Sequence, residues 1–150
     1  MLERERPLFY THVMQGLRLY KAEKLCSRTA IEQVFAQGRG TIAYPLRAVY
    51  DFGAEGEAPA QILISIPKKK IRPAVRRVLL RRRVREAYRL LRRSALHPAL
   101  QKGHVTAHIA FVYLANEVVD YHVIEAKMST LLARIAQDAA SRQSTASPCD

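Results

Sequence analysis

The stretch RPAVRRVLLRRRVREAYRLLRR, residues 72–93, holds the strongest structural signal in the sequence. Pro73 fits the first turn of a helix, where a missing N–H is tolerated. Successive helical residues are turned by about 100°, and this spacing gathers apolar side chains on one stripe. The stripe consists of Leu80, Val84, Ala87, Tyr88 and Leu91. The spacing therefore predicts a long helix that packs this stripe against a sheet.

The same region carries the excess positive charge of the protein. Residues 68–93 contain 13 of the 25 lysines and arginines but one acid, Glu86, and the formal net charge of the chain is +12. Solvated helix faces alternate in sign, because like charges four residues apart repel one another. This concentration therefore predicts a polyanionic partner, with nucleic acid favoured over an acidic membrane surface. Charge alone does not decide between RNA and DNA.

A helix and three strands are predicted on the N-terminal side of the basic stretch. Ser27 or Thr29 can cap that helix, and Thr29 and Glu32 have the spacing of a capping box. Gly38 is a suitable C-terminal end for it. Three strands are predicted to follow, at residues 41–44, 46–52 and 61–66. The last two are expected to pair as a hairpin across the turn GAEGEAPA.

On the C-terminal side, residues 105–114 are apolar on both alternating faces, which is typical of a central strand. A last helix is predicted at about 120–140, and residues 97–103 break the pattern. The expected fold is an α+β single domain over 21–140, with a mixed sheet of about four strands in the order α-β-β-β-α-β-α. Residues 1–20 are expected to form a partly ordered extension, and 141–150 a disordered tail.

The composition excludes several classes of protein. Cys26 and Cys149 lie far apart, which favours a reducing cytoplasm. From the sequence we expect neither a secretory signal nor a membrane-spanning helix. No protein active site is visible, so no catalytic residue is predicted. His104 and His108 would lie ~13 Å apart in a strand, too far to share a metal ion. Glu86 is expected to be an ion-pair partner rather than a general base.

Several segments, in order, resemble the protein component of bacterial ribonuclease P over roughly residues 21–138. The matching segments are KLCSRTAIEQVFAQGRG, YPLRAVY, ISIPKKK, AVRRVLLRRRVREAYR and YHVIEAKMSTLLARI. The fourth is the most specific. The chain departs from the family where Val78 and Leu79 follow Arg77, because the family has Arg-Asn-Arg there.

The resemblance implies a division of labour between protein and RNA. A catalytic RNA, which holds Mg²⁺, hydrolyses the phosphodiester 5′ of mature tRNA, and the protein alone binds no cofactor. The residues implied to bind the catalytic RNA are Arg76, Arg77, Arg81, Arg82, Arg85, Arg89 and Arg93. A cleft between the first helix and the sheet is implied to hold the leader of precursor tRNA, with Ile31, Phe35, Tyr50, Ser65, Lys68 and Lys69 as its candidate residues. The family also has a left-handed β-α-β crossover around the basic helix.

Three functions remain open from the sequence: ribonuclease P protein, another protein that binds structured RNA, or a DNA-binding protein. Phe35 and Tyr50 offer stacking surfaces for single-stranded bases. Core packing is the alternative for both, and for Tyr50 it is equally favoured.

Overall fold

The computed structural model describes residues 19–145 of the protein. Its elements in chain order are η1 (Lys21–Glu23), α2 (Arg28–Gln37), β1 (Arg39–Ala43), β2 (Leu46–Ala54), β3 (Ala60–Ser65), α3 (Ala74–Ala95), α4 (His97–Gly103), β4 (Val105–Tyr113) and α5 (Tyr121–Thr145). None of the helices in this range is both long and apolar enough to cross a membrane.

The four strands form one mixed sheet in the order β1-β2-β4-β3. β4 pairs antiparallel with β2 and parallel with β3, so it is the central strand that its two apolar faces predicted. The predicted hairpin between β2 and β3 is wrong, because β4 lies between them. The connection from β3 to β4 passes through α3 and α4, so the expected β-α-β crossover around the basic helix is confirmed. Its left hand stays a prediction.

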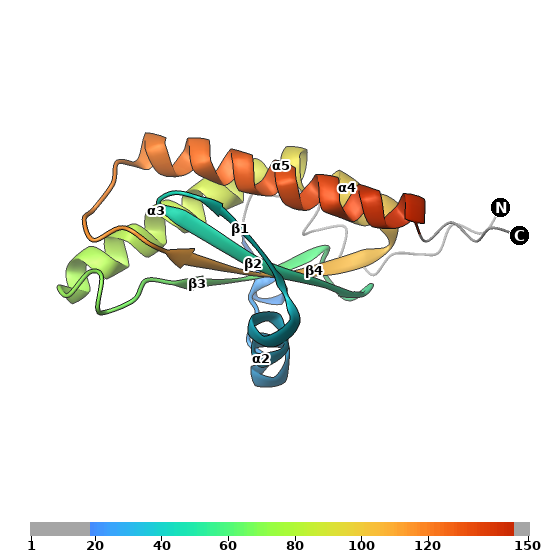
Figure 1. The fold of residues 1–150 in the computed structure, drawn as a ribbon, viewed down its shortest axis with the longest axis horizontal. Helices are drawn as coiled ribbons and strands as arrows, with labels where there is room; N and C mark the ends of the chain where they lie inside the picture. Colours follow the sequence, from blue (N-terminus) through green and yellow to red (C-terminus); the bar gives the residue numbers. More distant parts are fainter. Residues whose placement is uncertain (1–18, 146–150) are drawn as a thin grey trace, which may run out of the picture.

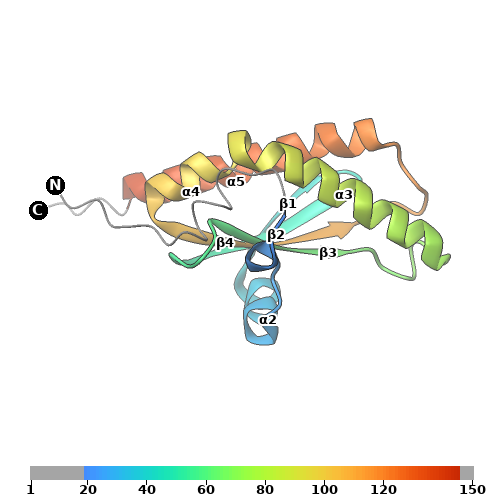
Figure 2. The same cartoon turned by 180° about the vertical axis from the view of Figure 1, so that it is seen from behind.

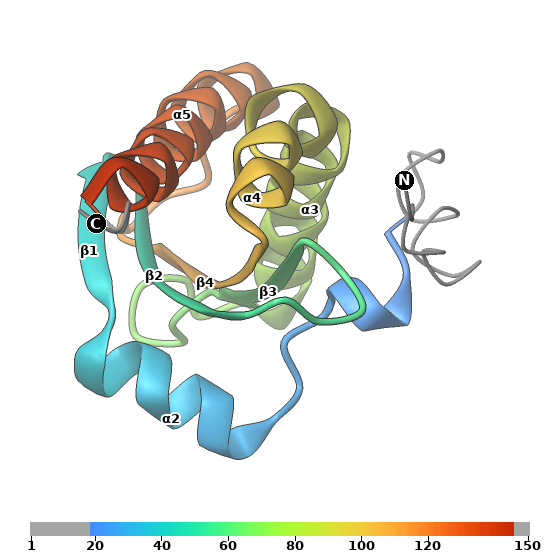
Figure 3. The same cartoon turned by 90° about the vertical axis from the view of Figure 1, so that its right-hand side faces the viewer.

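The helices lie on both faces of the sheet. α3, α4 and α5 cover one face, and α2 lies on the other (Figures 1, 2 and 3). The main core lies under the three helices, where Tyr88 of α3 packs on Phe111 of β4 with ring centroids 5.8 Å apart. Leu80, Val84 and Ala87 are buried beside it, so the predicted stripe of α3 is confirmed.

The segment at residues 97–103, where no element was predicted, forms α4. Pro98 lies in its first turn and Leu100 is buried in the core. His104 ends the helix in a left-handed conformation, with φ of 53°. This helix has 7 residues, or about two turns, which is too short for its spacing to give a detectable signal.

A buried ion pair connects the segment before α2 to α3. The Nε of Arg92 donates to Oε1 of Glu23 at 2.8 Å, and both side chains are 0% exposed. The other carboxylate oxygen accepts from the backbone N–H of Tyr20 at 3.0 Å. Burial raises the pKa of the Glu23 carboxyl, although Tyr20 and Arg92 oppose this change. Burial, with Arg92 and Arg93 nearby, lowers the pKa of His97 to about 3 and keeps its ring neutral.

The C-terminal helix α5 packs along the sheet and secures its β1 edge. Its predicted apolar positions are buried: Ile124, Met128, Leu131, Leu132 and Ile135. Asp138 accepts from Arg39 at 2.9 Å and from the hydroxyl of Tyr50 at 3.0 Å. Arg134 donates to the carbonyl of Ile42 at 2.7 Å. α5 extends to Thr145, five residues beyond the predicted end at 140, so residues 141–145 of the expected tail are helical. The rest of that tail, 146–150, and residues 1–18 of the expected extension lie outside the described residues.

Candidate nucleic-acid interface

The helix α3 presents a dense group of arginines to solvent. Arg76, Arg81, Arg82 and Arg85 are exposed, whereas Arg77, Arg89 and Arg93 are half-buried. The four exposed residues form no ion pair with any acid in the described part of the chain. We call them the arginine face. They include four of the seven residues that the resemblance implied for the catalytic RNA.

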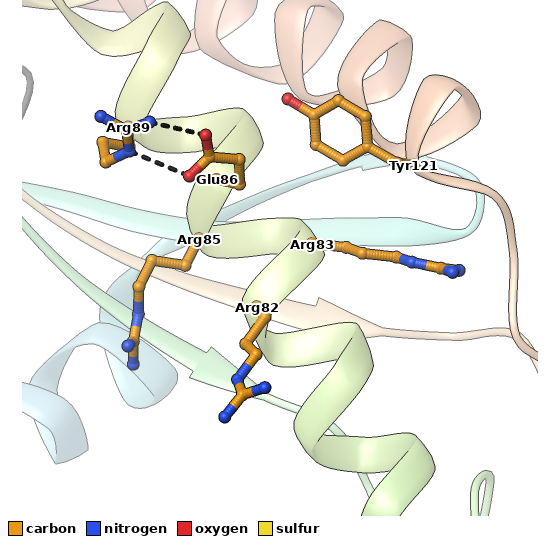
Figure 4. Close-up of a pocket in the computed structure, with 6 residues that line it drawn as sticks. All are labelled: Arg82, Arg83, Arg85, Glu86, Arg89 and Tyr121. Carbon is orange, nitrogen blue, oxygen red and sulfur yellow. Dashed lines mark hydrogen bonds and ion pairs between the residues drawn. The ribbon is translucent and has the colours of Figure 1, made fainter.

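A shallow hollow lies beside this face, near the start of α5 (Figure 4), and it contains an ion pair between Glu86 and Arg89. It is lined by Arg82, Arg83, Arg85, Glu86, Arg89 and Tyr121. Glu86 accepts two hydrogen bonds from Arg89, at 2.6 and 2.9 Å, as expected of an ion-pair partner. These bonds hold the pKa of the Glu86 carboxyl below its ordinary value. Arg89 therefore carries less uncompensated charge than Arg82 and Arg85, which extend away from the helix.

Three arginines of the basic stretch have structural partners within the protein. Arg77 donates to the carbonyls of Ile71 and Arg72, at 3.2 and 2.7 Å, and so fixes the loop that enters α3. Arg83 donates to the carbonyl of Val119 at 2.7 Å. Arg92 is buried against Glu23. From the sequence alone, these three arginines cannot be distinguished from the arginines that are exposed to solvent.

The second candidate surface lies where α2 crosses the other face of the sheet. Val34 of α2 is buried against Val49 of β2 and Ala110 of β4, and Ile31 packs beside them. Phe35 lies on the same helix and is 50% exposed. Ser65 at the end of β3 is half-buried, and the turn that follows exposes Lys68 and Lys69.

Tyr50 does not belong to this surface. Alternate residues of a strand point to opposite faces, and Val49 already faces α2. Tyr50 is buried in the main core, where its hydroxyl donates to Asp138 of α5. Burial, with the Asp138 carboxylate, raises the pKa of Tyr50 to about 12. The prediction that Tyr50 lines the leader cleft is therefore wrong, and its alternative, core packing, is confirmed.

At the start of α3 the chain exposes an apolar patch of Val75, Val78 and Leu79. Val78 is 43% exposed and Leu79 is 40% exposed, so the two residues that depart from the family pattern both reach solvent. Neither side chain offers a hydrogen bond.

Comparisons with known proteins agree on one family. A profile of the Ribonuclease P family matches residues 19–136. The ribonuclease P protein component of Porphyromonas gingivalis, in two strains, is 41% identical over 119 residues, which are 79% of this chain and 86% of that protein. The solved structure of the Staphylococcus aureus RNase P protein shares the fold, with a TM-score of 0.57 at 16% identity, over 78% of this chain and 97% of that one.

The fold and the arginine face define a small α+β protein with its excess positive charge on one helix and on the turn that leads into it. The extent of the sequence match makes the assignment specific: the chain belongs to the ribonuclease P protein family. It is the protein component of the ribonucleoprotein endoribonuclease that acts on tRNA precursors. Of the three functions left open by the sequence, the comparisons support the first.

Proposed function

We propose that the arginine face of α3 binds the catalytic RNA and that the surface between α2 and the sheet binds the leader of precursor tRNA. The observation that carries the first part is the set of four exposed arginines without acidic partners in residues 19–145. Arginine suits RNA phosphates because its planar fork donates two hydrogen bonds at once.

The second part rests on the chemistry of the α2 surface. Single-stranded nucleic acid binds where flat apolar groups lie beside cations. Phe35 is half-exposed there, and Lys68 and Lys69 follow Ser65 at one end of the sheet. The turn that carries these lysines leads directly into α3. The two proposed surfaces therefore adjoin at this end of the molecule.

In this proposal the catalytic centre, with its Mg²⁺, belongs to the RNA. The chain supplies positioning groups: arginines for the catalytic RNA, and the α2 surface for the substrate leader. Action in the cytoplasm, expected from the sequence, remains a prediction.

The purified protein alone is expected not to cleave precursor tRNA. With its cognate RNA it should lower the Mg²⁺ concentration needed for cleavage and should favour precursor over mature tRNA in binding. Gel analysis of 5′-labelled precursor, across a Mg²⁺ titration with and without the protein, measures both effects. Robust cleavage by protein freed of RNA would overturn the division of labour.

Val78→Asn tests whether the start of α3 contacts RNA. Restoring an amide is expected to tighten binding to a catalytic RNA from a bacterium that has the common motif, by about 0.5–1.5 kcal/mol, the net contribution of one hydrogen bond. With a co-adapted cognate RNA, the same substitution should be neutral or harmful. Dissociation constants for the two RNAs, measured side by side, provide the comparison. If neither changes, Val78 does not contact RNA.

A further inference from the structure

A row of side chains crosses the whole sheet beside α2. Strand register places Ile42 opposite Arg47, Arg47 opposite Val112, and Val112 opposite Ser65, so the row includes one residue from each strand. Each lies two positions from a member of the neighbouring row, which is Gly40, Val49, Ala110 and Leu63. Residues two apart in a strand share a face, so both rows lie on the α2 face.

α2 covers the second of these rows and leaves the first open. Val49, Ala110 and Leu63 pack with α2 in one cluster. In the open row, Ile42 is 57% exposed, Arg47 is exposed, and Ser65 and Val112 are half-buried. The open row spans three strand spacings, or ~14 Å, which gives it room for more than one nucleotide.

Arg47 is the one cation of this row, and its guanidinium group lies beside Gly40 of β1. A Cβ atom on Gly40 would be 3.3 Å from Nη2 and 3.5 Å from Nε of Arg47. The guanidinium group therefore lies against the backbone of β1, in the space that a side chain at position 40 would crowd. No acid among residues 19–145 forms an ion pair with it. Its charge on this face has no counter-ion within the described part of the protein.

We propose that Arg47 contacts a phosphate of the single-stranded RNA leader as the leader crosses this row. The inference rests on the proposed leader surface and adds a residue that the sequence did not single out. Ile42 and Val112 flank the guanidinium with apolar surface that suits bases, while the fork of Arg47 suits a phosphate between them. A phosphate contact positions the strand and reads no base, so it serves leaders of any sequence.

The alternative is that Arg47 is only solvated and contacts no RNA. The two hypotheses predict different effects of leader length on the binding of substrates to the R47A enzyme. The holoenzyme, assembled from cognate RNA and either wild-type or R47A protein, is titrated with mature tRNA and with precursors of increasing leader length. Removing a charge-assisted contact is expected to weaken binding of long-leader precursor roughly tenfold and to reduce its log–log salt slope by ~0.7. Binding of mature tRNA should not change. R47K should retain part of the affinity, because it keeps the charge and loses the fork.

Lys102→Ala is the matched control, since it removes one exposed positive charge from α4 on the opposite side of the sheet. It should bind every substrate as wild type does. The role of Arg47 would be overturned if R47A weakened the binding of mature and precursor tRNA equally. It would also be overturned if R47A bound precursor as tightly as the wild type while the affinity of the wild type still depended on leader length. A wild-type enzyme whose affinity ignores leader length would instead overturn the leader surface itself.

Discussion

Replacing Arg92 by alanine is expected to lower the free energy of unfolding by about 3–5 kcal/mol, as when one partner of a buried ion pair is lost. The Glu23 carboxyl is fully buried and accepts from Arg92 at 2.8 Å, so the variant leaves a carboxylate without the cation that faces it. Urea denaturation at neutral pH, followed by circular dichroism, measures the loss. Because Glu23 lies just before α2, the loss should also loosen the chain segment that positions that helix.

Two further variants test whether the ion pair is the cause. Arg82→Ala removes an exposed arginine from the same helix, and it should change stability by no more than ~0.5 kcal/mol. The double variant Glu23→Leu/Arg92→Met removes both charges and should be more stable than R92A. If R92A were as stable as Arg82→Ala, the buried pair would contribute nothing to folding.

Removing Arg76, Arg82 and Arg85 together is expected to flatten the salt dependence of catalytic-RNA binding. Each phosphate contact contributes ~0.7–0.9 to the log–log slope, so the triple alanine variant should lose about two to three units. Its affinity at ~0.1 M salt should fall by roughly 10²-fold. Arg89 is kept, because its ion pair with Glu86 already offsets its charge. Equilibrium binding across a series of salt concentrations gives the slope.

A second triple variant, with alanine at Lys21, Lys102 and Arg134, removes the same charge from exposed positions outside the arginine face. None of these three residues forms an ion pair with an acid among residues 19–145. It should leave the slope close to that of wild type. Equal flattening in both variants would mean that the RNA responds to net charge and not to α3.

Local periodicity predicted most of the elements, and pairing between distant segments was harder to predict. The stripe of α3 and the apolar faces of β4 both follow from residues close in sequence, and both are confirmed. The hairpin between β2 and β3 was wrong because the insertion of β4 depends on a strand about forty residues further along the chain. Sequence adjacency favours pairing in most proteins, and here the crossover through α3 overrides it.

The candidate site shows the same division between local and distant information. Helical phasing exposes Arg82 and Arg85 as predicted, but it does not reveal that Arg92 pairs with Glu23, which lies 69 residues away. On β2, the choice between Tyr50 and Arg47 depends on strand parity, because a shift of one residue exchanges the two faces of a sheet. The alternating pattern of side chains in β2 shows which residues share a face of the sheet, but it does not show which of the two faces α2 covers.

The two outer strands of the sheet are both partly occupied along their free sides. Arg134 reaches the Ile42 carbonyl of β1, and the backbone N–H of Leu25 donates to Ile62 of β3 at 2.8 Å. Open strand edges are where sheet proteins recruit further chains and aggregate. Ile42 adds an exposed apolar side chain to the β1 edge, so the hydrogen bond from Arg134 occupies an edge that would otherwise favour contact with another chain. The long α5 helix thus occupies part of the β1 edge, where another strand could pair, as well as covering the core.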